Sequence, residues 1–196
     1  MTKQQLARLA ASDPQVALKV ARALDDPWTA CQTLGWVARF APEACVEAIV
    51  DEAIRAGRRA EDPYRIVGSA AWPLRALVER GRMDRLESVR PGVMSFALRI
   101  VSHASRSEAI FLIYQAVFPA GRRYWLTVFQ ELALASQPAI HWRQTRNIRD
   151  AVLMAAKEDP DFARDFRRDL RNARAKAQIE RRLALAEYRS PRVFFW

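Results

Sequence analysis

The sequence is poor in the residues that build metal centres and disulfide frameworks. It has two cysteines and two histidines among 196 residues. Cys31 and Cys45 lie in apolar helical patterns, where a free cysteine behaves as a small hydrophobic residue. His103 and His141 have no cysteine, histidine or carboxylate at ligand spacing, and two thiols alone do not form a zinc site. We therefore expect neither a metal nor another cofactor.

Catalytic and nucleotide-binding motifs are also missing. There is no serine, histidine and aspartate ordering around a nucleophile turn, and no G-x-G-x-x-G or G-x-x-x-x-G-K-S/T loop. The six glycines fall mostly where helices should end, which leaves few to cradle a phosphate. With no catalytic constellation, we expect a protein that is not an enzyme.

Long apolar runs are absent as well. No run approaches the ~18 residues that a helix needs to cross a bilayer. The opening stretch, MTKQQLARLAASDP, lacks the apolar core of a signal peptide. We therefore expect a cytoplasmic protein with no membrane span.

Positive charge, in contrast, is abundant. The chain has 32 lysines and arginines against 22 acidic residues, a formal net charge of +10. Residues 1–100 contain 15 basic and 12 acidic residues, and residues 101–196 contain 17 and 10. Such a balance favours anionic partners, namely nucleic acid, acidic protein surfaces or anionic lipid, and it places any anion-binding surface mainly in the second half. The alternative is that arginine serves only as a solvated surface cation.

Four Asp–Pro pairs indicate where helices begin, at positions 13–14, 26–27, 62–63 and 159–160. An aspartate side chain accepts hydrogen bonds from the free N–H groups of a first helical turn, and proline fits the first helical position. Each pair precedes a helical apolar pattern, so each predicts a helix start. Ser105 and Glu108 have the spacing of a further capping box.

Two stretches repeat at a fixed interval. Residues 61–77 echo residues 25–41, and the alignment places Trp28 opposite Tyr64 and Trp36 opposite Trp72. A period in the thirties is typical of α-solenoids, in which each unit contributes two helices. The matched Trp36 and Trp72 are predicted to be core residues between units. Trp28 and Tyr64 lie in first turns and are candidate aromatic contacts for a partner.

The apolar spacing predicts helices from one end of the chain to the other, with no alternation typical of strands. Gly57 and Gly81 are expected to cap two of them, and Pro73 is expected to kink one. Pro91–Gly92 is expected to divide its region into two helices. The expected helices cover 42–56, 63–80, two segments of 83–103, 107–118, 122–136, about 139–157, and 160–188.

These elements predict an all-α fold. We expect an α-α superhelix, or solenoid, of about four to five antiparallel helix pairs without a sheet, forming one domain over residues 1–188. An aromatic tail follows at residues 189–196. A compact, irregular helical bundle is the alternative architecture.

The two-helix period, with Asp–Pro entries and small-residue helices, resembles the HEAT-like and tetratricopeptide-like α-solenoid superfamily over residues 13–157. Leu34–Gly35–Trp36 contains elements of the tetratricopeptide consensus at a different spacing. The resemblance is architectural, and it implies a concave surface that binds another macromolecule. HEAT-like DNA glycosylases are similar in architecture and charge, and Asp150 is the first acid to inspect under that reading.

The segment 160–188 carries the densest charge. Phe162, Phe166, Leu170 and Ala173 form a stripe that should dock on the preceding repeat. Arginines on this segment and the one before it could bind phosphates or carboxylates, or could form ordinary surface pairs such as Asp165–Arg168. The candidate anion-binding residues are Arg143, Arg146, Arg149, Arg164, Arg167, Arg168, Arg171, Arg174, Arg181 and Arg182.

The sequence ends in Val-Phe-Phe-Trp after a proline. Leaving large apolar side chains in water costs roughly 1.5–3 kcal/mol each. We therefore expect Phe194, Phe195 and Trp196 to be aromatic contacts that fold back onto the chain's own repeats, or that insert into a partner or a second copy and form a homodimer.

Two functional hypotheses follow. The first is a non-enzymatic α-solenoid interaction module that binds a protein or peptide partner, expected to be acidic, along its concave face. The second is a solenoid that binds nucleic acid by contacting phosphates through the arginines of the second half. Base-excision chemistry in a basic cleft is a third.

Overall fold

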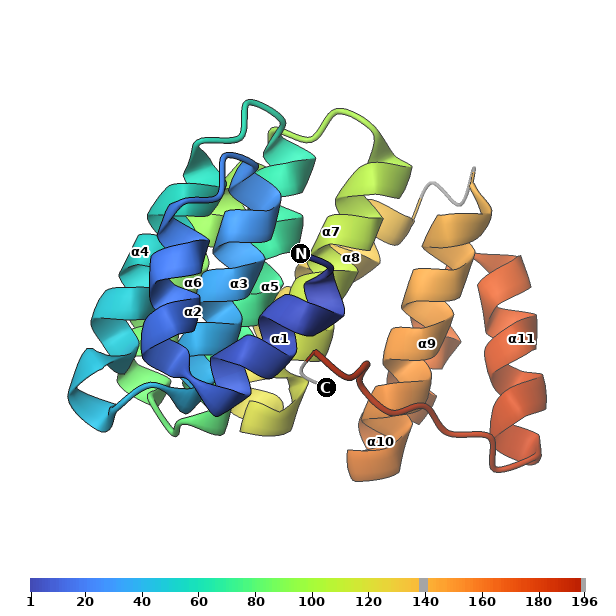
Figure 1. Cartoon of the computed structure of the whole chain (residues 1–196). Coiled ribbons are helices and arrows are strands. Elements are labelled where there is room, and N and C mark those ends of the chain that lie inside the picture. The colour runs from blue at the N-terminus through green and yellow to red at the C-terminus, as the bar shows by residue number, and fades with distance from the viewer. Residues whose placement is uncertain (138–140, 195–196) are drawn as a thin grey trace.

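The computed structural model describes residues 1–137 and 141–194, and these residues form an entirely helical fold (Figure 1). The all-α prediction is confirmed. Short 3-10 helices cover Glu43–Cys45 and Phe118–Ala120. The α-helices of the described residues are α1 (Lys3–Ser12), α2 (Pro14–Arg22), α3 (Pro27–Phe40), α4 (Val46–Arg58), α5 (Pro63–Glu79), α6 (Met83–Ala97), α7 (His103–Val117), α8 (Arg122–Ser136), α9 (Trp142–Glu158), α10 (Pro160–Asp169) and α11 (Ala173–Ala184).

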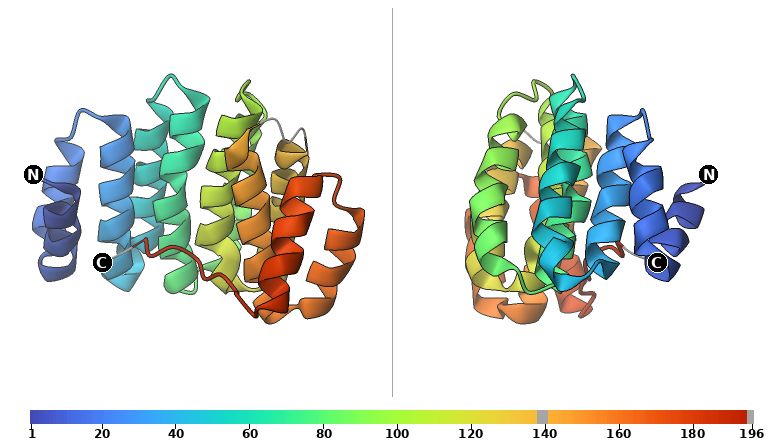
Figure 2. Two further views of the ribbon diagram at one scale, coloured as in Figure 1. Left: turned by 90° about the vertical axis from the view of Figure 1, so that its right-hand side faces the viewer. Right: turned by 60° about the vertical axis from the view of Figure 1, so that its left-hand side comes forward.

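Four helices form a row that we call the front row: α3, α5, α7 and α9, each packed against the next. Helices α4, α6 and α8 each pack against the two front-row helices that flank them in sequence. Helices α1 and α2 pack on α3 at one end, and α10 and α11 pack on α9 at the other. Figure 2 shows the helices following one another across the molecule in chain order.

The predicted Asp–Pro helix starts are confirmed. Asp13, Asp26, Asp62 and Asp159 are N-cap residues, each followed by proline in the first turn. Their carboxylates accept backbone N–H groups at 3.0, 2.8, 2.9 and 3.0 Å respectively. Each bond satisfies a donor that the helix cannot satisfy by itself.

The predicted capping box at Ser105 is wrong. Helix α7 begins three residues earlier than Ser105-x-x-Glu108 implies, because the Ser102 hydroxyl accepts the backbone N–H of Ser105 at 3.3 Å. Glu108 is therefore free to pair with Arg146 of α9. His141 is the N-cap of α9, and its side chain accepts the backbone N–H of Arg143. The helix was expected at about 139–157, and its first expected residues lie outside the described residues.

Pro91–Gly92 does not divide its region, which corrects a second prediction. Helix α6 is continuous over Met83–Ala97 with Pro91 inside it. Leu86 and Val93, seven residues apart, are both buried, so the two halves bury the same face and this shared face holds the helix together through the proline. Gly57 also lies inside its helix, α4, rather than capping it, whereas Gly81 has the expected positive φ of 66°.

The helix predicted over 160–188 is two helices. Asn172 separates α10 from α11, since its Oδ1 accepts the Ala175 backbone N–H at 2.9 Å and its Nδ2 donates to Thr145 of α9 at 3.3 Å. The predicted docking of Phe162 and Phe166 is confirmed: their rings lie 5.1 and 4.7 Å from the ring of Phe129.

A glycine sets the distance between the first two front-row helices. A Cβ at Gly35 of α3 would lie 2.8 Å from the backbone of Trp72 and Pro73 in α5, which is closer than any real contact. The helices therefore approach closely only because position 35 has no side chain. This contact brings Trp36 and Trp72 beside each other.

The membrane prediction can also be checked against the helices. Within residues 1–137 and 141–194, no helix combines the length and the apolar character needed to cross a bilayer.

Candidate functional site

After α11 and a turn at residues 185–186, the chain runs back across the front row without regular secondary structure, and we call residues 185–194 the tail (Figures 1 and 2). The Arg189 N–H donates to the carbonyl of Leu153 in α9 at 3.4 Å. The Arg192 N–H donates to Oε1 of Gln115 in α7 at 3.0 Å. Phe194 reaches α5 and α3. One extended segment therefore contacts all four front-row helices, and we call the surface it occupies the groove.

Two tryptophans bind the same atom of the tail. The indole N–H groups of Trp36 and Trp72 both donate to the carbonyl oxygen of Phe194, at 3.0 and 3.1 Å. Asp26 and Asp62 cap their helices at the same number of residues before each tryptophan, so equivalent positions of α3 and α5 supply the two donors. Both lone pairs of a carbonyl that water cannot reach are thereby satisfied.

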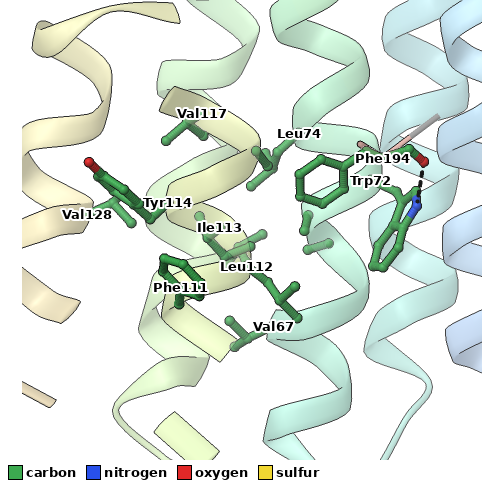
Figure 3. Close-up of a cluster of buried hydrophobic side chains, with 14 of the residues drawn as sticks. Val67, Trp72, Leu74, Phe111, Leu112, Ile113, Tyr114, Val117, Val128 and Phe194 are labelled. Atoms are coloured by element: carbon green, nitrogen blue, oxygen red, sulfur yellow. Dashed lines mark hydrogen bonds between the residues drawn. The ribbon is translucent and has the colours of Figure 1, made fainter. Parts of the chain in front are cut away.

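The side chain of Phe194 fills a buried pocket beside these donors. Only 2% of Phe194 is exposed, and its ring lies 5.4 Å from the Trp72 ring at 80°, an edge-to-face contact (Figure 3). The prediction that the aromatic end folds back onto the chain's own helices is confirmed for Phe194. The other predicted contacts there, Phe195 and Trp196, lie outside the described residues.

Arg192 lies at the outer edge of the same pocket. Its guanidinium carbon is 5.3 Å from the Trp72 ring centre and 5.4 Å from that of Phe194, within range of cation–π attraction. Burial of the guanidinium lowers the pKa of Arg192, and the negative charge of Glu108 opposes that shift. The group stays charged.

A polar cluster holds the carboxylate of Glu108 in place. Glu108 pairs with Arg146 and accepts a hydrogen bond from Nδ2 of Asn147 at 3.3 Å. Asn147 also donates to the buried hydroxyl of Ser107 at 3.2 Å. Burial, and then the nearby Glu108, raise the pKa of Tyr64, so this phenol stays neutral. Glu108 is thus held in an ion pair with Arg146, and the hydrogen bond from Asn147 fixes its position.

The predicted aromatic contacts Trp28 and Tyr64 adjoin this pocket. Their rings stack at 6.2 Å and 22°, and Trp28 makes an edge contact with Trp72 at 6.1 Å. Both residues are half-buried. The structure therefore brings Trp28, Tyr64 and Phe194 together through Trp72.

The predicted anion-binding arginines are divided between separate places. Arg149, Arg181 and Arg182 line one pocket, and Arg164 and Arg167 line another. Arg171 lies in the break between α10 and α11. Arg143 lies over the Trp142 ring at 5.7 Å. Six of the ten candidates pair with carboxylates of the chain itself: Arg146 with Glu108, Arg149 with Asp150, Arg164 with Asp161, Arg167 with Glu180, Arg168 with Asp165, and Arg182 with Glu187.

Sequence reasoning missed part of the site. Gln115 and Arg192 were not candidates, and Trp36 and Trp72 were predicted only as core. Their burial is confirmed, with exposed fractions of 0% and 3%. Their matched positions in the two similar stretches of sequence indicate that the two indoles lie near each other. The sequence does not indicate which group accepts their hydrogen bonds.

The described residues contain no group of three or more side chains that could hold a metal ion. No protein-family model, curated protein or solved structure matches this chain. The functional interpretation therefore rests on the groove itself.

Proposed function

We propose that this chain is a non-enzymatic α-solenoid interaction module that holds an extended segment of a partner protein in the groove. The observation that carries this proposal is the double hydrogen bond from Trp36 and Trp72 to one main-chain carbonyl. Recognition through the main chain provides affinity for an extended segment, and a side-chain pocket adjoining it provides selectivity.

The solenoid arrangement is supported by the packing pattern. Each front-row helix contacts the next, and one further helix packs on each successive front-row pair, as expected when repeats bury their apolar faces only against neighbours. Equivalent N-caps at Asp26 and Asp62 support the same reading.

An acidic partner, as the net charge favours, would have to bind outside the pocket. The Arg192 guanidinium lies over the rings of Trp72 and Phe194, and the charge of Glu108 favours its charged form, so the pocket itself favours a basic side chain. Acidic partner residues would instead meet arginines for which the described residues show no carboxylate within salt-bridge distance, such as Arg171, Arg174 and Arg181 on and beside α11.

Nucleic-acid binding remains the second candidate, because the net charge of +10 favours it. The ion pairs of six predicted arginines weigh against it, since a paired guanidinium neutralises a phosphate poorly. A salt titration with labelled random duplex and single-stranded DNA separates the two. We expect no binding at ~50 mM salt, and binding with a steep negative salt dependence would instead support the nucleic-acid reading. The glycosylase reading is weaker, as Asp150 is engaged by both Arg149 and Arg189.

The direct test of the proposal uses an amidated, fluorescently labelled peptide with the sequence of residues 187–194, EYRSPRVF. It is titrated into the full chain carrying Phe194→Ala, whose pocket is left unfilled. We expect saturable binding. A variant that keeps its helical circular dichroism but binds no peptide at the highest soluble concentration would overturn the proposal.

A further inference from the structure

Two side chains near the end of the tail contact the groove. Phe194 is buried, the Arg192 guanidinium lies against the Trp72 and Phe194 rings, and Val193 between them is 64% exposed. Arg192 as a whole is exposed, and it is its guanidinium that lies over the rings of Trp72 and Phe194. The tail therefore contacts the groove through a buried aromatic ring and, two residues earlier, through an arginine that covers this ring from the solvent side.

We propose that the groove selects partner segments with an arginine two residues before an aromatic residue, and that the tail is a built-in competitor with the same pattern. This inference rests on the proposed function and names the partner chemistry and the regulation of that groove.

The aromatic position is defined by shape. The Trp72 ring meets the edge of Phe194, and the two indole donors fix the carbonyl of the same residue. A side chain that is not a flat ring loses the edge-to-face contact, and a smaller one leaves part of the pocket empty.

The arginine position is defined by charge and by the ring beneath it. Trp72 offers its face to a cation, and the guanidinium carbon of Arg192 lies 5.3 Å from the centre of that ring. The charge of Glu108, which Arg146 and Asn147 hold in place, adds an attraction that favours the charged form of Arg192. A carboxylate in place of Arg192 would lose the contact with the ring and would be repelled by Glu108.

The spacing of two residues is defined by the main chain. Gln115 accepts the N–H of Arg192, and the two indoles donate to the carbonyl of Phe194. These bonds fix the register of the segment, because a shift by one residue would move both side chains away from their contacts.

The tail and a partner segment must compete, because both would need the same contacts. Two segments cannot occupy one pocket or share the same two indole donors, so a partner binds only when Phe194 leaves. Ten positions separate Ala184, the last residue of α11, from Phe194, and an extended chain spans about 3.3 Å per residue. The tail thus reaches its own groove without a second copy.

The experiment compares the wild-type chain with Phe194→Ala and with Val193→Ala, the matched control whose side chain points outward. The probe is the EYRSPRVF peptide. We expect it to bind the Phe194→Ala chain at least tenfold more tightly than the wild type, and the Val193→Ala chain within twofold of the wild type. Equal affinity for the wild-type and Phe194→Ala chains would overturn the competitor role while leaving the proposed function standing.

Peptide variants test the selected pattern on the Phe194→Ala chain. Peptides carrying Arg192→Ala or Phe194→Ala should bind at least tenfold more weakly, and a Val193→Ala peptide should bind within twofold. Equal binding of all four peptides would overturn the pattern. Failure of every peptide to bind a folded Phe194→Ala chain would overturn the proposed function as well.

A measurement on the wild-type chain covers the case in which Phe194→Ala does not fold. Excess peptide should increase hydrogen exchange at the amides of Arg189 and Arg192, since both are bonded only while the tail is docked. Unchanged exchange at saturating peptide would overturn the competitor role. Sedimentation of the same chains tests docking in a second copy. A dimer that forms in the wild type and in Val193→Ala but not in Phe194→Ala would place the tail in the groove of a second copy, and would overturn the competitor role too.

Discussion

At the scale of single residues, two glycines inside helices differ in what surrounds them. A Cβ at Gly35 would meet the backbone of α5 at 2.8 Å, whereas a Cβ at Gly92 of α6 would meet only the flexible end of Arg58 at 3.2 Å. We expect Gly35→Ala to lower the free energy of unfolding by about 1–3 kcal/mol through overpacking. Gly92→Ala should raise it by about 0.5–1 kcal/mol, because alanine favours the helix.

Urea denaturation of the two variants measures both effects. A loss of stability in Gly35→Ala together with a gain in Gly92→Ala would confirm that the close contact with α5, and not helix propensity, determines the effect at position 35. An unchanged midpoint for Gly35→Ala would contradict the close approach of α3 to α5.

Asp26 predicts a dependence of stability on pH. Burial raises its pKa, but hydrogen bonds from Thr29 and Arg65 outweigh burial, so the folded pKa lies below the ordinary 3.8. The stabilisation of the fold by the ionised Asp26 carboxylate is therefore present above about pH 4, and it is lost as the pH falls through the pKa of Asp26 in the folded chain. Replacing this N-cap by Asp26→Ala should cost about 1 kcal/mol at pH 7. The difference between variant and wild type, measured by denaturation at several pH values, should shrink below pH 3.8.

The two cysteines should differ in reactivity. Burial raises the pKa of the Cys31 thiol to about 12, and the side chain is fully enclosed, whereas Cys45 is exposed. Only the thiolate attacks a disulfide reagent. We expect an aromatic disulfide reagent to label one thiol in the native chain and two in denaturant, with Cys45→Ser removing the native signal. Rapid labelling of Cys31 in the native chain would show that α3 and α4 separate readily.

At the scale of helices, Asn172 lies at the break between α10 and α11 and stabilises the start of α11. Its side chain caps α11 and reaches Thr145 of α9. We expect Asn172→Ala to lower the free energy of unfolding by about 1–2 kcal/mol, since a cap is lost and a buried hydroxyl loses a partner. The exposed neighbour provides the control: Arg171→Ala should change stability by less than about 0.5 kcal/mol. Thermal denaturation of both variants measures the difference.

The contrast between Asp26 and Asn172 shows which helix boundaries a sequence can predict. Asp26 caps α3 through atoms three residues away, so the Asp–Pro pair carried the whole signal. Asn172 acts together with Thr145, 27 positions earlier, and no local pattern records that contact. Pro91 is the converse case, because burial of Leu86 and Val93 overrides a local helix breaker.

The same limit applies to the groove. The apolar character of Phe194 predicted that it would be buried, and the repeat predicted that Trp36 and Trp72 would be neighbours. The hydrogen bonds from the two indoles to Phe194 could not be predicted, because the Phe194 carbonyl lies 158 positions after Trp36 in the chain. The pairing of the candidate arginines could be predicted only in part. Local pairs such as Asp165–Arg168 follow from sequence spacing, whereas the pair of Arg146 with Glu108 joins two helices and depends on the fold.

At the scale of the whole molecule, the tail connects helices that otherwise do not meet. Most contacts join helices that are close in sequence, so each helix is stabilised mainly by its neighbours in the chain. The tail adds a connection from α9 to α3. We expect Phe194→Ala to lower the slope of the urea transition, or to split it in two, because the ends of the array can then unfold separately. Fluorescence and circular dichroism transitions that coincide in the wild type and diverge in the variant would confirm this.

The bond between Trp36 and Phe194 also has a consequence for the order of folding. It closes a loop of 158 positions, whereas the front-row helices find each other across a few tens of residues. The entropy of closing a loop grows only with the logarithm of its length, but the pair of indole donors is assembled only after α3 and α5 have packed. Docking of the tail should therefore be the last step of refolding, and the two indoles, which change environment at that step, provide an intrinsic fluorescent signal for it.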